Sequence, residues 1–372
     1  MRNVVGIVNL HDGPHLGSIT ANRPLGTVSL LGRYGLMDFA LSNLSNSGID
    51  RIGIMVENNV QAVRTHLGSG SIWINNTVTG FIRYFSNEKD VNNDKFNTDI
   101  KDIAVNRHQL EGLDADYVVV VPPFFLMSID LSEVVKQHIA NNADITVVYT
   151  NAKHADRDYR TCEEIMVDQN GRISNISEFN GMRKSANISL QTYVFKREVF
   201  ETLVRKGKEI SAFYNIRQMV TYMTNNHLAK THAYEFDGYV APMISLDNYV
   251  RYSFELLDYK NRCKLFNEDW PIYTTTHNTP PSLYGPNADV KNSFIANGSI
   301  IKGKVRNSII SRDVVVEEGA VVENSILFSD TYVGEGVKVT YVLSDKNARI
   351  VEKKKVSGTE DEILCIGYGV RV

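Results

Sequence analysis

The feature of this chain that most limits its fold is an aliphatic repeat in the last quarter of the sequence. The pair Asn-Ser recurs at 292, 307 and 324, each time followed by apolar residues. Isoleucine or valine recurs every five or six residues, at Ile295, Ile300, Val305, Ile310, Val315, Val321 and Ile326. An α-helix repeats every 3.6 residues and a strand every two, so neither can use this period. Short strands turning three corners per coil can, and we predict about three coils of a parallel β-helix.

The first two-thirds of the chain alternates strand and helix patterns. Strand patterns cover 2–10, 51–56, 116–124 and 144–150, and helix patterns cover 37–48, 59–70 and 131–142. The β-branched run at 117–121 is typical of a central strand covered on both faces. This alternation predicts a mostly parallel sheet with helices on both faces. We expect an α/β domain over 1–265, a linker over 266–288 and the β-helix over 289–372.

Composition limits the partners and the location of the chain. Its 372 residues carry a formal net charge of −3, and Lys and Arg form no dense tract, so we expect no nucleic-acid partner. The apolar runs at 4–10 and 117–129 are too short, or interrupted by proline, to span a membrane. The three cysteines lie far apart in sequence, which predicts neither disulfides nor a metal site and favours the cytoplasm.

The segment at 33–54 reads RYGLMDFALSNLSNSGIDRIGI. It resembles the corresponding segment of the bacterial glucose-1-phosphate adenylyltransferases. The residues in register are Tyr34, Leu36, Asp38, Phe39, Leu41, Ser42, Asn43, Asn46, Ser47, Gly48 and Ile49. Further similarities at His66, Trp73, 192–195, 245–249 and the Asn-Ser repeats extend the resemblance over nearly the whole chain. It implies a Rossmann-like nucleotidyltransferase domain followed by a left-handed parallel β-helix.

The glycine-rich phosphate loop of this family is altered here. Glycines let backbone N–H groups surround a phosphate, and basic side chains neutralise it. Read onto this chain, the loop motif falls on Leu10, His11, Asp12, Gly13, Pro14, His15 and Leu16, and only Gly13 and Leu16 match it. His15 stands at the motif arginine, and we expect it to be largely neutral. Arg23 is retained, whereas Leu25 replaces a phosphate-binding lysine. The loop is thus predicted to be vestigial, with Gly13 and Arg23 as its remnants.

The other charged positions that the resemblance identifies are also replaced. Phe124 and Pro242 stand where the family has the two Mg²⁺-binding aspartates, and Phe179 stands near the sugar-phosphate lysine. Removing one electrostatic group typically costs a few kcal/mol of transition-state stabilisation. The resemblance therefore implies no catalytic residues, no metal site and no Mg²⁺ in this subunit. His11 and His15 have a metal-like spacing, but Gly13 and Pro14 exclude the helix that would align them.

The resemblance is closest to the non-catalytic, GlgD-type regulatory subunits. It implies a role in glycogen synthesis and a heterotetramer with a catalytic paralogue. Arg33 and Arg51 match positions near the family's effector site, so a sugar phosphate or another anion is a candidate ligand, and solvated surface arginines are the alternative. A weakly active nucleotidyltransferase and a stand-alone sugar-phosphate or nucleotide sensor remain open. A hexapeptide-repeat acyltransferase is disfavoured, because no histidine follows His277.

Overall fold

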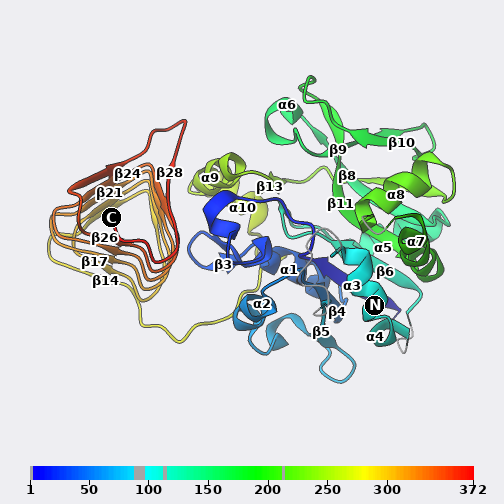
Figure 1. Cartoon of the computed structure of the whole chain (residues 1–372), viewed down its shortest axis with the longest axis horizontal. Helices are drawn as coiled ribbons and strands as arrows, with labels where there is room; N and C mark the ends of the chain where they lie inside the picture. The colour runs from blue at the N-terminus through cyan, green and yellow to red at the C-terminus, as the bar shows by residue number, and fades with distance from the viewer. Residues whose placement is uncertain (1–2, 88–96, 112–114, 212–213) are drawn as a thin grey trace.

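The computed structural model describes residues 3–87, 97–111, 115–211 and 214–372. Short strands rich in valine and isoleucine form the centre of its N-terminal domain (Figure 1). Four of them pair in parallel in the order β6-β1-β4-β5: β1 (Val4–Asn9), β4 (Arg51–Met55), β5 (Phe81–Phe85) and β6 (Tyr117–Val121). The predicted central strand is therefore confirmed as β6, which β1 flanks on one side.

The long strand β11 (Ala186–Lys196) makes the sheet mixed, because it runs antiparallel to β6. It also pairs antiparallel with β8 (Ile145–Ala152) and β9 (Glu163–Val167). Two further strands extend these: β12 (Thr231–Glu235) is parallel to β8, and β10 (Ile173–Glu178) is antiparallel to β9. The small pairs β2 (Ser29–Leu30) with β3 (Tyr34–Gly35) and β7 (Phe125–Leu126) with β13 (Ala241–Pro242) lie outside this sheet.

Helices cover both faces of the sheet, as predicted. One core layer contains side chains from α1 (Met37–Asn46), α2 (Val60–Leu67), α5 (Leu131–Ala140) and α9 (Leu246–Glu255). The other contains α3 (Asp99–Val105), α7 (Arg197–Ile210) and α8 (Ile216–Asn225). Alternate valines of β6 belong to opposite layers. The short helices are α4 (His108–Glu111), α6 (Ala155–Asp158) and α10 (Tyr259–Leu265), with 3₁₀ turns at Gly17–Thr20, Leu25–Thr27 and Ser71–Trp73.

The C-terminal repeat forms three parallel five-stranded sheets, stacked as five coils rather than the three that the sequence predicted. Valine and isoleucine side chains such as Ile301, Val305 and Ile310 fill the centre. The first sheet comprises β14 (Leu283–Tyr284), β17 (Ile300–Ile301), β20 (Val315–Val316), β23 (Tyr332–Val333) and β26 (Arg349–Ile350). The second comprises β15 (Asp289–Lys291), β18 (Lys304–Arg306), β21 (Val321–Glu323), β24 (Lys338–Thr340) and β27 (Lys355–Ser357). The third comprises β16 (Phe294–Ile295), β19 (Ile309–Ile310), β22 (Ile326–Leu327), β25 (Val342–Ser344) and β28 (Leu364–Ile366).

The repeated asparagines lie at one corner of successive coils. Asn292, Asn307 and Asn324 have positive φ angles of 44°, 44° and 47°. The Asn292 side-chain amide donates to Asn307 Oδ1 at 2.9 Å, and the Asn307 amide donates to Asn324 Oδ1 at 2.6 Å. Asparagine is among the few residues that tolerate the left-handed region. In the next coil Tyr341 occupies the equivalent corner at φ 53°.

The segment between α10 and β14 is fastened to helices of the N-terminal domain. Trp270 Nε1 donates to Asn43 Oδ1 at 2.8 Å, the Tyr273 N–H donates to Ser42 Oγ at 2.8 Å, and Thr275 Oγ1 donates to the carbonyl of His66 at 2.6 Å. The first strand of the β-helix, β14, begins at Leu283, within the range 266–288 that the sequence assigned to a linker.

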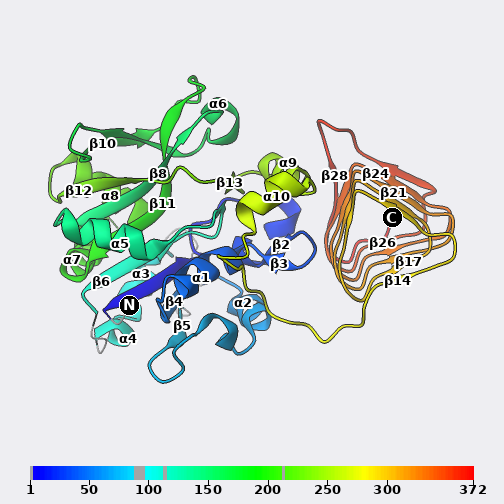
Figure 2. The ribbon, with the colours of Figure 1, turned by 180° about the vertical axis from the view of Figure 1, so that it is seen from behind.

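The β-helix packs directly against the α/β domain, and both ribbon views place it beside α9 and the β2–β3 pair (Figures 1 and 2). Ile309, Ile326, Phe328 and Leu343 belong to the same apolar cluster as the α/β domain. The Tyr249 and Phe328 rings meet edge to face with centroids 6.4 Å apart. The two domains therefore share one continuous core.

Candidate functional site

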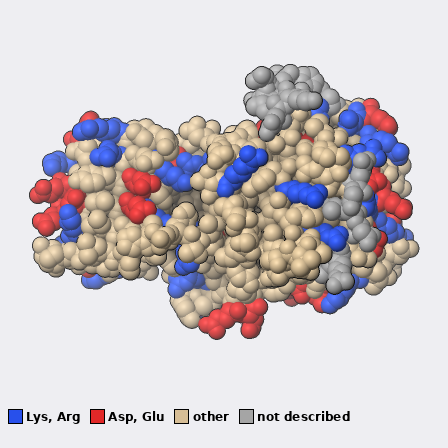
Figure 3. Space-filling view, turned by 90° about the horizontal axis from the view of Figure 1, so that it is seen from below, with Lys and Arg blue, Asp and Glu red and all other residues tan. Residues whose placement is uncertain are grey.

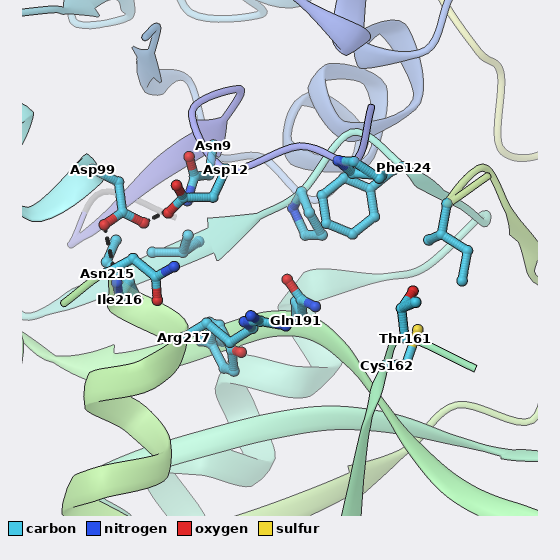
Figure 4. Close-up of a pocket in the computed structure, with 15 residues that line it drawn as sticks. Asn9, Asp12, Asp99, Phe124, Thr161, Cys162, Gln191, Asn215, Ile216 and Arg217 are labelled. Carbon is cyan, nitrogen blue, oxygen red and sulfur yellow. Dashed lines mark hydrogen bonds between the residues drawn. The ribbon is translucent and has the colours of Figure 1, made fainter. Parts of the chain in front are cut away.

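A small pocket lies where β1 and β6 end, at the edge of the sheet where open α/β folds bind ligands (Figure 4). Its volume is about 120 Å³. Asp12 and Asp99 lie on one side and Phe124 on the other, with Arg217 below them in the view. The lining residues are Asn9, Asp12, Pro14, Asp99, Val120, Pro122, Phe124, Thr161, Cys162, Gln191, Tyr193, Asn215, Ile216, Arg217 and Ile244.

His11 lies beside this pocket, buried in an ionic cluster that joins the loop after β1 to α3 and in which the Asp12 side chain is 37% exposed. The His11 side chain is 1% exposed, with Nδ1 3.2 Å from Asp12 Oδ1 and Nε2 3.8 Å from Asp102 Oδ2. Asp99 and Asp102 both lie on α3 and are fully buried. Asp99 accepts hydrogen bonds from Asn9 Nδ2 at 2.9 Å and from the Ile216 N–H at 3.0 Å.

The pKa values of His11, Asp102 and Asp99 are all raised. Burial would lower the pKa of His11, but the hydrogen bond to Asp12 and the charges of Asp12, Asp102 and Asp99 raise it to about 9. Burial raises the pKa of Asp102 to about 7, with the His11 charge opposing the rise. Burial also raises the pKa of Asp99 well above its usual value. These pKa shifts favour the positively charged form of His11 at neutral pH.

Most of the other candidate site residues from the sequence analysis lie outside the small pocket. Phe124 lines the pocket and is 5% exposed. Leu10, Leu25, Phe179 and Pro242 are buried but do not line it, and His15 is exposed. A side chain at Gly13 would meet Leu25 at 3.4 Å, so the leucine fills space beside the loop. The two histidines of the loop thus have opposite environments and do not converge.

Arg23 lies outside this pocket. Its Nη2 donates to both carboxylate oxygens of Asp345 in the β-helix, at 2.6 and 2.8 Å. The arginine is 8% exposed and the aspartate is fully buried. Its other terminal nitrogen, Nη1, is buried and has no hydrogen-bond partner in the described part of the chain. Arg23 therefore connects the two domains.

A larger cavity of about 630 Å³ lies between the two domains. Arg23 and Arg33 line it from the α/β domain, and Arg312 and Lys346 line it from the β-helix. Arg51, the second predicted effector residue, stands at the start of β4 and is not among the lining residues. The structure thus brings Arg33 together with three cations that were not predicted to lie beside it.

The cations of this inter-domain cavity repel one another. Burial and the charge of Arg33 lower the pKa of Arg312, and burial and the charge of Arg23 lower the pKa of Lys346. Asp313 and Asp330 also line the cavity and offset part of the charge. A bound anion would relieve this repulsion, because an opposite charge stabilises the charged form of each cation.

One wall of the cavity carries a carboxylate–imidazole pair. His66 Nε2 lies 2.6 Å from Asp38 Oδ1, and the Gly35 N–H donates to Asp38 Oδ2 at 2.8 Å. A Cβ at Gly35 would lie 2.7 Å from the His66 ring, so glycine permits this approach. The pair fixes the orientation of the imidazole against the inter-domain cavity.

Comparisons with known proteins identify the family to which this chain belongs. A nucleotidyl transferase model matches residues 12–239, well over half of the chain, and a model of the C-terminal hexapeptide region of GlmU-like proteins matches 283–362. The chain belongs to the nucleotidyl transferase family. The hexapeptide match agrees with the left-handed β-helix that the resemblance implied, so the predicted fold class is confirmed.

Two curated relatives show which nucleotidyl transferases this chain resembles in sequence. The chain is 29% identical over 309 residues to a glucose-1-phosphate adenylyltransferase of Lachnospira eligens, which covers 82% of this chain and 72% of the relative. It is 28% identical over 332 residues to the protein of the same name from Acetivibrio thermocellus, covering 88% and 77%. The chain is thus homologous to glucose-1-phosphate adenylyltransferases.

The residues present do not fit the Mg²⁺ ion of a nucleotidyl transferase. Mg²⁺ prefers octahedral oxygen ligands. The side chains of Phe124 and Pro242 offer none, and both oxygens of Asp99 already accept hydrogen bonds. No group of three or more His, Cys, Asp or Glu residues in the described ranges is placed to hold a metal ion.

The surface charge and the apolar character of the helices bear on binding to nucleic acids and membranes. Lys and Arg are interspersed with Asp and Glu on the face shown in Figure 3, and no continuous basic tract crosses it. Among the described residues, no helix combines the length and the apolar character needed to cross a bilayer.

Proposed function

We propose that this chain is a catalytically silent regulatory subunit of a glucose-1-phosphate adenylyltransferase. That enzyme forms ADP-glucose and pyrophosphate from ATP and glucose 1-phosphate, and we assign this chain to the same step of glycogen synthesis. The observation that carries the proposal is the pocket at the ends of β1 and β6. Its volume of about 120 Å³ is below the roughly 300–1,000 Å³ of small-molecule sites.

The charges that remain in the pocket support the same conclusion. Arg217 is the basic residue of the lining, whereas Asp12 adds negative charge and Asp99 adds a buried carboxyl group whose pKa is raised. Adenylyl transfer develops negative charge on phosphate oxygens, which enzymes stabilise with cations and N–H groups. Acidic groups at this position would oppose both nucleotide binding and catalysis.

The inter-domain cavity supports a regulatory role. Arg23, Arg33, Arg312 and Lys346 offer a positive environment, and Arg23 Nη1 is buried without a partner. We assign this cavity to a sugar phosphate or another small anion. Because residues of both domains line it, an anion there can favour one arrangement of the domains over another. Such differential binding is what a ligand needs in order to shift a conformational equilibrium.

The working form in this proposal is a heterotetramer with a catalytic paralogue that supplies the Mg²⁺ site. The test is an assay of ADP-glucose formation with ATP, glucose 1-phosphate and Mg²⁺, for the chain alone and mixed with a relative that retains the charged residues. We expect the chain alone to be at least about a thousandfold slower than the relative. The mixture should show a raised rate or a changed response to sugar phosphates.

Matched variants distinguish an effect of anion binding in the inter-domain cavity from an effect of losing an arginine elsewhere. Arg312→Gln should weaken the response of the mixture to sugar phosphates, whereas Arg51→Gln, outside the cavity, should leave it unchanged. Turnover by the isolated chain at an enzyme-like rate would support a weakly active transferase instead. Anion binding by a homo-oligomer that ignores the paralogue would support a stand-alone sensor. Either result would overturn the proposal.

A further inference from the structure

We propose that the protonated side chain of His11 holds the loop after β1 against α3, and that loss of this proton at alkaline pH releases the loop and opens the small pocket. The inference rests on the contacts around His11 and does not depend on the regulatory function proposed above.

The backbone of the loop is already tied to its surroundings on one side of the histidine. The His11 N–H donates to Asn9 Oδ1 at 2.9 Å, and Asn9 Nδ2 donates to Asp99 Oδ2. Asp99 in turn accepts from the Ile216 N–H at the start of α8. Residue 11 therefore lies at the junction of the loop, α3 and α8, where a change in its charge acts on all three.

The contact between His11 and Asp102 depends on charge and not on a hydrogen bond. The separation of 3.8 Å between His11 Nε2 and Asp102 Oδ2 is too long for a hydrogen bond. His11 Nε2 is buried and has no hydrogen-bond partner among the described residues, whereas the Asp102 carboxylate accepts a backbone hydrogen bond from Asn87. A neutral imidazole would therefore leave the buried carboxylate without its positive neighbour.

The charged side chains that act electrostatically on His11 in the described residues are all acidic. Asp12 belongs to the same loop, Asp99 and Asp102 belong to α3, and Glu57, which follows β4, acts on Asp102. Isolated buried charges are strongly unfavourable, and removing one member of a buried pair is costly. The imidazolium thus supplies the positive charge that lets this acidic cluster remain closed.

The direction of the pH dependence follows from the raised pKa values. His11 has a pKa of about 9 in the folded chain against 6.5 ordinarily, so its contribution is complete below pH 6.5 and is lost as the pH rises through 9. Asp102, raised from 3.8 to about 7, changes stability in the same direction at lower pH. From the His11 shift alone, the opening equilibrium can rise by at most about 300-fold.

The experiment combines NMR titration of the histidine rings with hydrogen exchange of the loop at residues 10–16. We expect the His11 ring to titrate near pH 9 and the loop, after correction for intrinsic exchange rates, to lose at least tenfold protection between pH 7 and 10. His11→Gln should remove most of this pH dependence. His15→Gln, which changes an exposed histidine of the same loop, should retain it.

Asp102→Asn provides a second variant in case His11→Gln does not fold. It keeps the side-chain shape but removes one acidic neighbour, so the His11 titration should move to lower pH. A His11 ring that titrates near 6.5 in the unmodified chain would overturn the proposal. The proposal would also be overturned if the hydrogen-exchange protection of the loop had the same pH profile in the unmodified chain, in His11→Gln and in Asp102→Asn.

Discussion

At the scale of single residues, the aromatic side chain of Phe124 lines the small pocket at the edge of the sheet. The Phe124 ring lies 5.1 Å from that of Phe125, which stacks on Tyr159 at 6.3 Å. The sequence predicted that Phe124 stands at a family metal position. The ring packing requires the structure, because Tyr159 is distant in sequence and joins through the folded chain.

Replacing Phe124 by aspartate tests whether one restored acid is enough for activity. Phe124→Asp places a carboxylate in the pocket opposite Asp12 and Asp99 and removes an aromatic contact, so we expect the free energy of unfolding to fall by about 2–4 kcal/mol. ADP-glucose formation should stay absent because Pro242 still provides no second ligand. Phe124→Leu is the control, expected to cost about 1 kcal/mol in urea unfolding. Measurable turnover by the aspartate variant would contradict this account of the pocket.

His11 and Arg23 show where reading single residues from sequence fails. The sequence suggested an ordinary loop position for His11 and a remnant of phosphate binding for Arg23. Asp12 is the sequence neighbour of His11, but the buried α3 carboxylates beside it follow by some ninety residues, and Asp345 is 322 residues from Arg23. Local spacing contains no signal for such contacts. A buried charge is recognised only once the fold has brought its partners together.

At the scale of elements, the β-helix was the most predictable part of the chain. The five- or six-residue period of aliphatic residues is a direct consequence of its geometry, so the sequence alone identified the β-helix. The buried core contains Ile301, Val316 and Val322, each next to a residue of the predicted series. The last two coils were missed because they lack the Asn-Ser pair: Tyr341 and Val342 stand where Asn324 and Ser325 stand one coil earlier. The mixed character of the α/β sheet was also missed, since a strand pattern does not record the direction of pairing.

The corner at Tyr341 offers a test of this geometry. A left-handed conformation costs a non-glycine residue about 1–2 kcal/mol, and asparagine less. Tyr341→Asn should therefore raise the free energy of unfolding by about 1 kcal/mol, and its amide would extend the asparagine ladder. Tyr341→Phe keeps the unfavourable backbone angle and should change stability by only a few tenths of a kcal/mol. A thermal midpoint that falls in the asparagine variant would refute the explanation.

At the scale of the whole molecule, the two domains are joined by packing and by the buried Arg23–Asp345 ion pair. The apolar cluster runs from the sheet through α9 into the β-helix. Gly32, at φ +71°, lies so close to the β-helix that a Cβ would meet the Ile310 carbonyl oxygen at 2.8 Å. The sequence predicted two domains in the correct order, but it could not predict this interface, since neither domain alone shows which face is covered.

Breaking the ion pair measures how far the interface contributes to stability. Asp345→Asn leaves the buried Arg23 guanidinium without a counter-charge, so we expect a loss of about 3–5 kcal/mol in urea unfolding. The control is Glu133→Gln, which breaks the exposed pair with Lys136 and should cost less than about 1 kcal/mol. Equal small effects in both variants would show that the pair adds little to the joint between the domains.

The fastening of residues 270–275 to α1 and α2 constrains how this protein can move. Large rotations of one lobe against another need a few backbone positions that are free to absorb them. Here the connecting chain is held by hydrogen bonds to the α/β domain that it leaves, and an apolar cluster packs the two domains together beside the inter-domain cavity. We therefore expect an anion bound in the inter-domain cavity to act through small shifts at the domain interface and not through a large rotation of one domain, because close-packed interiors have low compressibility.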